Sequence, residues 1–244
     1  MADVPRSHPR YESLMTRARI EEGVRQGLVA TQGLIAHGRG EAFDYLLGET
    51  TIPPADEAAR AAAAHLLLGR NSVLSVNGNT AVLVPDELAA LQATLRCKME
   101  VNLFHRTEER VRKLVAHLEA HGCTHVLGAG AEPTIPGLDH ERGRSTREGI
   151  FSADVVLVPL EDGDRCQALR DMGKTVIVVD LNPLSRTAKS ASVSITDNVR
   201  RAIPRIDEHA RGMTSEEAAA VAKGFDAAAN LRETLDHIVA RLKV

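Results

Sequence analysis

A cluster of polar residues directly after a hydrophobic run carries groups that could bind ribose and phosphate. It follows the run that ends at Val179 and extends over Asp180–Thr187. An aspartate at a strand end can accept both ribose hydroxyls, and Arg186 would lie near the N-terminus of a helix that begins at Pro183, where phosphate is favoured. The Asp and Asn of the cluster could instead cap that helix, so the motif alone leaves both interpretations open.

A second cluster, with Glu161, Asp162 and Asp164, follows the hydrophobic run Val155–Pro159. Carboxylates close to phosphates could hold Mg²⁺, which prefers oxygen ligands. They could equally be acids that stabilise a helix beginning near Arg165. No residue is therefore assigned as a metal ligand, and the histidines never form an H-E-x-x-H motif.

Glycines on both sides of Arg39 indicate a loop, because Gly38 and Gly40 permit backbone conformations that other residues avoid. Such a loop can approach a phosphate closely, and the guanidinium can bind two of its oxygens. The alternative is an ordinary turn with a solvated arginine. A short helix is expected to follow over Glu41–Leu47.

The fourth group of candidates lies where a predicted strand passes into a helix. Asn102 alternates with apolar neighbours, and His105 and Arg106 follow at the strand end. These side chains could bind an anion or exchange a proton. The alternative is a solvated helix start, at which Glu108 and Arg112 form a weak surface pair.

The longest stretch without clear periodicity, Gly128–Phe151, is dense in ionisable groups, among them His140 and Arg142. Loops of this length in compact domains are usually functional, so we expect a substrate loop.

The elements that must position these residues alternate between short aliphatic runs and helical segments. This alternation is typical of a doubly wound α/β fold with a mostly parallel, Rossmann-like sheet of about six strands. Its strands end at one edge, outside which ligands bind. The expected strands are Val73–Val76, Lys98–Leu103, His125–Leu127, Val155–Pro159, Thr175–Val179 and Ser192–Ile195. The expected intervening helices are Pro85–Leu95, Thr107–Ala120, Arg165–Met172, Leu184–Ser190 and Val199–Ala210.

The 244 residues are interpreted as one domain with helical ends. An N-terminal helical part over 1–70 contains the helices Ser13–Gly27 and Ala55–Leu68, and the Rossmann-like core covers 71–210. Two Ala-rich helices are expected in 211–244, with a break near Ala228–Asn230.

The composition excludes several classes of function. A net charge of −3, 2% aromatic residues and no Trp argue against a nucleic-acid partner. The three widely spaced cysteines fit a reducing cytoplasm, and no stretch is apolar enough for a membrane helix. The missing G-x-x-x-x-G-K-[ST] and G-x-G-x-x-G motifs count against a standard kinase or nicotinamide enzyme.

Several long blocks, in the same order, resemble the archaeal phosphopantothenate synthetase family, also called 4-phosphopantoate–β-alanine ligase. The resemblance covers about residues 1–210, and the blocks are Ser7–Leu14, Gly33–Glu49, Ser75–Asn79, Glu100–Arg110, Ile135–Gly143 and Val155–Thr187. It implies a cytoplasmic ligase of coenzyme A biosynthesis that joins 4-phosphopantoate to β-alanine with ATP and Mg²⁺. It also implies an acyl-adenylate intermediate, the products 4'-phosphopantothenate, AMP and diphosphate, and a homodimer.

Carried over by position, the ATP contacts implied by the resemblance are Arg17, Arg39, Asp180, Leu181, Asn182, Arg186, Thr187, Asn198 and Val199. Edge position and charge assign 4-phosphopantoate to Asn77, Asn102, His105, Arg106, His140 and Arg142. Arg39, Arg186 and His105 are the catalytic candidates. The alternative functions are a nicotinamide-dependent reductase and a non-catalytic nucleotide-binding protein.

Overall fold

The computed structural model describes residues 4–160 and 162–243. Six parallel strands form one sheet in the order β3-β2-β1-β4-β5-β6, which confirms the predicted Rossmann-like layout with helical ends. The strands are β1 (Ser72–Val76), β2 (Lys98–Val101), β3 (Val126–Leu127), β4 (Val155–Pro159), β5 (Thr175–Val179) and β6 (Val193–Ile195). The α-helices are α1 (Tyr11–Arg25), α2 (Thr31–Leu47), α3 (Pro53–Leu68), α4 (Gly78–Leu83), α5 (Pro85–Leu95), α6 (Glu108–Ala120), α7 (Gly163–Asp171), α8 (Arg186–Ser190), α9 (Val199–Gly212), α10 (Ser215–Gly224) and α11 (Ala227–Leu242).

The two faces of the sheet are covered differently. One face packs against α3, α5, α6 and α9, and contributes alternate strand residues such as Leu74 and Ile177 to the larger core. The other face packs against α7 and the segment between β3 and β4, through residues such as Val156 and Ile150. Burial on both faces explains why the strands are continuous hydrophobic runs. The expected substrate loop therefore lies on the α7 face.

Helix α2 corrects the prediction of a loop around Gly38–Arg39–Gly40, because the whole segment lies inside one helix of 17 residues. Two of its glycines allow close packing. A Cβ at Gly33 would lie 2.3 Å from Asn79 Oδ1, and one at Gly40 would lie 3.4 Å from Leu181 Cδ1. Tertiary packing thus overrides the low helix propensity of glycine.

Three smaller expectations about element bounds are also wrong, and one helix is missing from the prediction. Helix α8 begins at Arg186 instead of Pro183, because the Ser185 hydroxyl accepts from the Ala188 N–H as N-cap. The break between the last two helices lies at 225–226, since Asp226 caps α11. Helix α4 was not expected. The first helix begins at Tyr11, two residues earlier than predicted.

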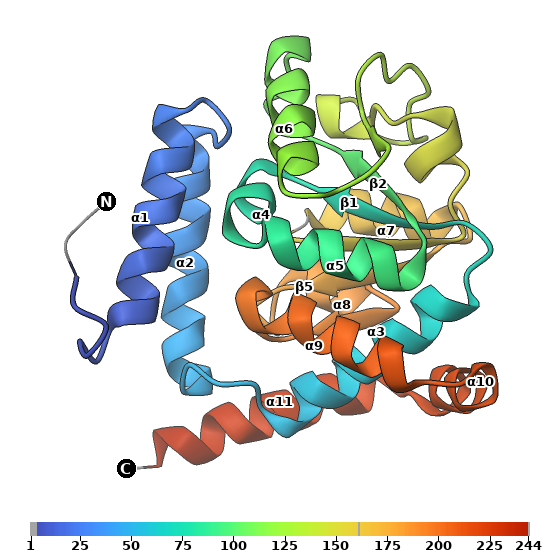
Figure 1. Ribbon diagram of the computed structural model, residues 1–244. Coiled ribbons are helices and arrows are strands. Elements are labelled where there is room, and N and C mark those ends of the chain that lie inside the picture. The colour runs from blue at the N-terminus through green and yellow to red at the C-terminus, as the bar shows by residue number, and fades with distance from the viewer. Residues whose placement is uncertain (1–3, 161, 244) are drawn as a thin grey trace.

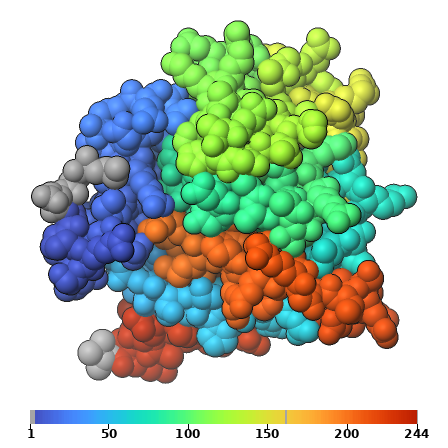
Figure 2. Space-filling view, viewed as in Figure 1, coloured from blue at the N-terminus to red at the C-terminus, as the bar shows by residue number. Residues whose placement is uncertain are grey.

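The N-terminal pair α1 and α2 stands along one side of the molecule, and α11 runs beneath α3 towards the end of α2 (Figure 1). Figure 2 shows the same side in space-filling form, with the blue N-terminal helices packed against the green segment that contains α4 to α6. None of the described helices is long and apolar enough to cross a membrane.

Candidate active site

Helix α2 crosses the carboxyl ends of the central strands. Its Gly33 carbonyl accepts a hydrogen bond from Asn79, just beyond β1, and its Gly40 lies against Leu181, just beyond β5. Seven residues of helix span about 10.5 Å, and two strand spacings span about 9.6 Å, so one helix can follow this edge without bending. Farther along, Asp44 accepts a hydrogen bond from Asn198, beyond β6. The helix thus carries His37, Arg39 and Glu41 along the edge.

Asp180 directly follows β5, and its carboxylate accepts hydrogen bonds from residues close by in the sequence. Oδ1 accepts the Asn182 backbone N–H at 3.0 Å, and Oδ2 accepts the Ser185 hydroxyl at 2.5 Å. Burial raises the pKa of the carboxyl above its ordinary value of 3.8, while these two hydrogen bonds and the charge of Arg39 oppose the rise. Asp180 and Asn182 therefore order the turn before α8 but do not cap the helix, whose N-cap is Ser185. The Asp180 carboxylate still has lone pairs on both oxygens for a ribose.

The three predicted phosphate-binding arginines each face a carboxylate. Arg17 of α1 forms an ion pair with Glu41 of α2 at 2.9 Å. Arg186 forms one with Asp164, at the start of α7. Arg39 is exposed and makes no hydrogen bond or ion pair within 4–160 and 162–243, and it acts on Asp180 through charge alone. Arg39 is thus the guanidinium most available to an incoming anion.

The remaining residues of the nucleotide set have structural contacts. Asn182 Oδ1 accepts the Leu184 N–H at 2.9 Å, and Thr187 is buried in α8. Leu181 is buried in a small hydrophobic cluster with Leu47, and Val199 is buried in the larger core. Leu181, Thr187 and Val199 are thus buried, whereas Asn182 is partly exposed.

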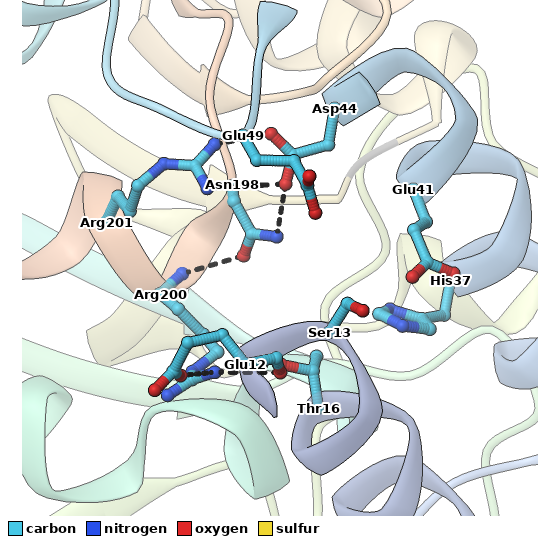
Figure 3. Close-up of a pocket in the computed structure, with 10 residues that line it drawn as sticks. All are labelled: Glu12, Ser13, Thr16, His37, Glu41, Asp44, Glu49, Asn198, Arg200 and Arg201. Carbon is cyan, nitrogen blue, oxygen red and sulfur yellow. Dashed lines mark hydrogen bonds and ion pairs between the residues drawn. The ribbon is translucent and has the colours of Figure 1, made fainter. Parts of the chain in front are cut away.

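A cavity of about 300 Å³ lies between α1, α2 and the start of α9. Figure 3 shows its lining, in which Asn198 caps α9 and donates to Asp44 at 3.0 Å. Arg201 holds the same aspartate at 2.5 Å. None of the three predicted phosphate-binding arginines lines this cavity. The lining residues are Glu12, Ser13, Thr16, His37, Glu41, Asp44, Glu49, Asn198, Arg200 and Arg201.

His37 is a half-buried histidine in the lining of this cavity. Burial lowers the pKa of the imidazole below its ordinary value of 6.5 and so favours the neutral ring. Its Nε2 is buried and has no hydrogen-bond partner in the described part of the chain. A buried polar atom without a partner is costly, and a ligand that fills the cavity could satisfy it.

The residues predicted for 4-phosphopantoate gather around the ends of β1 and β2. Asn77 caps α4 through Oδ1, which accepts the Thr80 N–H, and its amide donates to the Pro159 carbonyl at 2.9 Å. Asn102 is fully buried, and its amide donates to the carbonyls of Arg142 and Arg144 at 3.3 and 2.8 Å. Both asparagines therefore join a strand end to another segment.

Arg106 and Asn102 present buried polar atoms that lack partners in the described residues. The Arg106 side chain is 1% exposed and binds Glu108 and the Gly128 carbonyl through Nη2 alone. Its Nε and Nη1, and Asn102 Oδ1, have no hydrogen-bond partner there. Leaving donors of a buried guanidinium unsatisfied is costly, and a bound anion could supply the missing acceptors.

Phe104 brings two of the predicted histidines together. Its ring contacts His105 at 5.1 Å and His140 at 5.3 Å between centroids. His140 Nδ1 is buried without a partner among the described residues, whereas His105 is exposed. The loop that carries His140 thus meets the end of β2.

Glu100 organises the far end of that loop, a role that the sequence did not reveal. Its carboxylate accepts the Thr146 N–H, the Thr146 hydroxyl and the Ile150 N–H at 2.7, 2.9 and 2.7 Å. Burial raises the pKa of Glu100 above its ordinary value of 4.5, against these bonds and the charge of Arg165. A Cβ at Gly149 would lie 2.0 Å from Glu100 Oε2. The sequence feature that could have revealed this role is the position of Glu100, an acidic residue, within an apolar strand pattern.

The turn between β4 and α7 connects the two halves of the site. Asp162 forms an ion pair with Arg142 at 3.1 Å, and Asp164 forms one with Arg186. Glu161, the third acid predicted near the phosphates, lies outside the described residues. The described residues contain no group of three or more side chains able to hold a metal ion.

The chain is similar to known ligases over its full length. The family model for phosphopantothenate/pantothenate synthetase matches residues 54–241. The 4-phosphopantoate–β-alanine ligase of Thermococcus kodakarensis is 52% identical over 246 residues, which cover 99% of this chain and 94% of that protein. The ligases of the same name from Methanosarcina mazei and Methanospirillum hungatei are 48% and 49% identical, over 100% and 98% of this chain and 97% and 98% of their own lengths.

Proposed function

The chain belongs to the phosphopantothenate/pantothenate synthetase family, and on that premise we propose how its carboxyl edge joins 4-phosphopantoate to β-alanine. It is a ligase of this specificity, and the ligase family implies ATP as the co-substrate. Membership decides against the nicotinamide-dependent reductase and the non-catalytic nucleotide-binding protein. What remains to be derived is the chemistry that these residues perform.

Amide formation needs an activated carboxylate, because a free carboxylate is a poor electrophile at neutral pH. A carboxylate oxygen of 4-phosphopantoate attacks the α-phosphorus of ATP, and the bond from that phosphorus to the bridging oxygen breaks to release diphosphate. The β-alanine nitrogen then attacks the acyl carbon of the adenylate. AMP leaves with the former carboxylate oxygen, and the nitrogen loses its proton to give 4'-phosphopantothenate.

Two anions must meet in the first step, so preplaced cations contribute most to catalysis. Arg39, free of bonded partners within the described residues, is assigned to the transferring phosphoryl group. Arg17 and Arg186 exchange Glu41 and Asp164 for phosphate oxygens when the nucleotide binds. Arg39 and Arg186 therefore act as catalytic residues, and Arg17 as a phosphate-binding residue.

The nucleoside is assigned to the end of β5 and the adjoining cavity. Asp180 and Asn182 hold the ribose, since their carboxylate and amide lie at the strand end. Asn198 orients the nucleoside from the start of α9, and the nearby cavity of about 300 Å³ is lined by this residue and by His37. Leu181, Thr187 and Val199 support this turn from within the core instead of touching the base.

The phosphate of 4-phosphopantoate is assigned to Arg106 and its neighbours. The Nε and Nη1 of Arg106 have no hydrogen-bond partner among the described residues, so both could donate to phosphate oxygens. His105 and His140 flank the same place, and Arg142 and Asn102 fix the loop over it. Asn77 orients the pantoate part at the end of β1. His105, the exposed histidine, is assigned the proton transfer from the β-alanine ammonium.

Magnesium fits this site only as an ion whose ligands come mainly from the phosphates of the nucleotide. Mg²⁺ usually keeps several waters and takes one or two protein carboxylates besides phosphate oxygens. Asp162 and Asp164 are two acids beside the proposed phosphates, and both are held by arginines. The ion would offset phosphate charge, while the arginines of this chain orient the reactants. We also propose that the enzyme is a cytoplasmic homodimer.

The observation that carries this proposal is the link between the two halves. Asp162, the N-cap of α7, pairs with Arg142 on the substrate side, and Asp164 in the first turn of α7 pairs with Arg186 on the nucleotide side. A carboxylate and an α-phosphorus bound at these places would approach each other above β4, beside the point where the strand order reverses.

The test mixes purified protein with ATP, Mg²⁺, 4-phosphopantoate and β-alanine, and follows nucleotide products with each component left out in turn. We expect continuous AMP formation only in the complete mixture. Without β-alanine, diphosphate release should stop at the amount of enzyme present, because the adenylate accumulates. ADP as the product would show that the intermediate is an acyl phosphate and not an adenylate. Formation of no nucleotide product would refute the proposal.

A further inference from the structure

The C-terminal helix α11 touches the two elements that carry the proposed nucleotide site. Its Ile238 is 8% exposed and belongs to a hydrophobic cluster separate from the two main cores. The other buried members are Leu47 at the end of α2, Leu181 of the nucleotide turn, and Ile52 and Ala55 at the start of α3. Leu181 lies between Asp180 and Asn182. Packing in this cluster therefore fixes the position of the turn that carries the two proposed ribose-binding residues.

Arg241, one turn beyond Ile238, completes the end of α2. The N–H groups of Gly48 and Glu49 donate to the carbonyls of Asp44 and Tyr45 at 2.9–3.2 Å. The next carbonyl, that of Leu46, accepts the Arg241 Nε–H at 3.0 Å. Carbonyls in the last turn of a helix lack intrahelical partners, and a guanidinium both bonds them and offsets the helix dipole.

The fit at this point is close. Gly48 adopts φ +93°, and a Cβ there would lie 2.8 Å from Arg241 Cζ. At its other end α11 is held by Asn230, whose amide donates to the Pro54 carbonyl at 2.8 Å. Figure 1 shows the helix running beneath α3 to the lower end of α2. It therefore connects α3, which packs on the sheet, to α2, which crosses the sheet edge.

Arg39 makes no hydrogen bond or ion pair with residues 4–160 and 162–243 that would hold it at the site. It reaches Asp180 by charge alone, so its position depends on where α2 is held. At the N-terminal end, Asn79 bonds the Gly33 carbonyl at 3.0 Å. Near the other end, Asp44 is bonded to Asn198 and Arg201, and α11 supplies the last contacts.

We propose that α11 is a positioning element for ATP binding, in which Ile238 and Arg241 fix α2 and the turn at Asp180–Asn182 relative to each other. The proposal rests on the assignment of Arg39 and Asp180 to ATP. It predicts a selective defect, because the residues assigned to 4-phosphopantoate follow the ends of β1 and β2 or lie in the loop before β4, and none of them belongs to the cluster around Ile238.

The test compares Arg241→Ala, Ile238→Ala and the conservative variant Arg241→Lys with the wild type. Val239→Ala is the matched control, since Val239 lies next to Ile238 but is 52% exposed. Calorimetry measures Kd for ATP and, separately, for 4-phosphopantoate, so the readout does not depend on turnover. Thermal melts show that each variant is folded.

We expect Arg241→Ala and Ile238→Ala to raise the Kd for ATP about tenfold or more, as misplacement of binding groups does, with the Kd for 4-phosphopantoate unchanged. Arg241→Lys should recover much of the loss, and Val239→Ala should behave as wild type. If Ile238→Ala does not fold, Arg241→Ala decides alone, because its side chain is exposed. Unchanged ATP affinity, or equal losses for both substrates, would overturn the proposal. A wild type that binds no ATP would instead refute the assignment of the nucleotide site.

Discussion

The side-chain amide of Asn77 donates to the main-chain carbonyl of Pro159 at 2.9 Å and so joins the ends of β1 and β4. These two strands are neighbours at the centre of the sheet, and the strand order reverses between them. Ligands bind at such a reversal in open α/β sheets, because the connecting segments diverge there and leave a crevice. Asn77 therefore has two roles. It caps α4, and it links the ends of the two strands between which the substrates are proposed to meet.

The two roles of Asn77 can be separated by substitution. Asn77→Ala removes both the cap and the link, and we expect it to lower the unfolding free energy by about 1–2 kcal/mol. Asn77→Ser keeps a capping hydroxyl but cannot reach Pro159, so its stability should stay close to that of the wild type. Both variants should bind 4-phosphopantoate more weakly. Urea titration and calorimetry measure the two effects, and a Ser variant with wild-type affinity would show that the link has no functional role.

Gly38 tests the finding that α2 is one continuous helix. A Cβ at this position meets nothing within 4 Å, so Gly38→Ala should gain about 0.5–1 kcal/mol in unfolding free energy from helix propensity. Gly33→Ala is the matched control, because its Cβ would collide with Asn79 and it should be destabilised. Chemical denaturation measures both. A destabilised Gly38→Ala variant would indicate the flexible loop that the sequence suggests.

Arg39→Ala tests the proposed contact with developing charge. We expect a loss of about 2.7–4 kcal/mol of transition-state stabilisation, measured as the fall in kcat/KM. Arg70, which is exposed near the opposite ends of the strands, provides the control, and Arg70→Ala should be active. A fall in kcat/KM of less than about tenfold, or roughly 1.4 kcal/mol, would show that Arg39 does not contact the developing charge.

Glu100→Gln tests the anchoring of the substrate loop. The amide can accept at one oxygen only, so at least one of the N–H groups of Thr146 and Ile150 loses its acceptor. We expect a loss of about 1–3 kcal/mol in stability and a higher KM for 4-phosphopantoate, with little change in the KM for ATP. Steady-state kinetics with each substrate varied in turn measures this. Equal changes in both KM values would mean that Glu100 supports the fold generally.

The strands were largely predictable because each carries its own signal. Strands β4 and β5 begin and end at the predicted residues, since parallel strands buried on both faces are unbroken apolar runs. Helix α2 was missed because its glycines lower local helix propensity, and the packing that favours them involves residues far away in sequence, such as Asn79 and Leu181.

The position of candidate residues at the sheet edge was also predictable, because a polar residue after an apolar strand must lie at its carboxyl end. Asn77, Asn102 and Asp180 all do so. Their partners were not predictable. Arg17 and Glu41 are 24 residues apart, and only the antiparallel packing of two helices that look separate in the sequence brings them together. The roles assigned to these residues remain predictions.

The most direct measurement labels the carboxylate of 4-phosphopantoate with ¹⁸O and follows the label by mass spectrometry during turnover with ATP and β-alanine. Attack on the α-phosphorus leaves one carboxylate oxygen on the nucleotide, so the account predicts AMP that carries a single ¹⁸O. Unlabelled AMP, or label in inorganic phosphate with ADP as the product, would contradict an acyl-adenylate formed at this edge of the sheet.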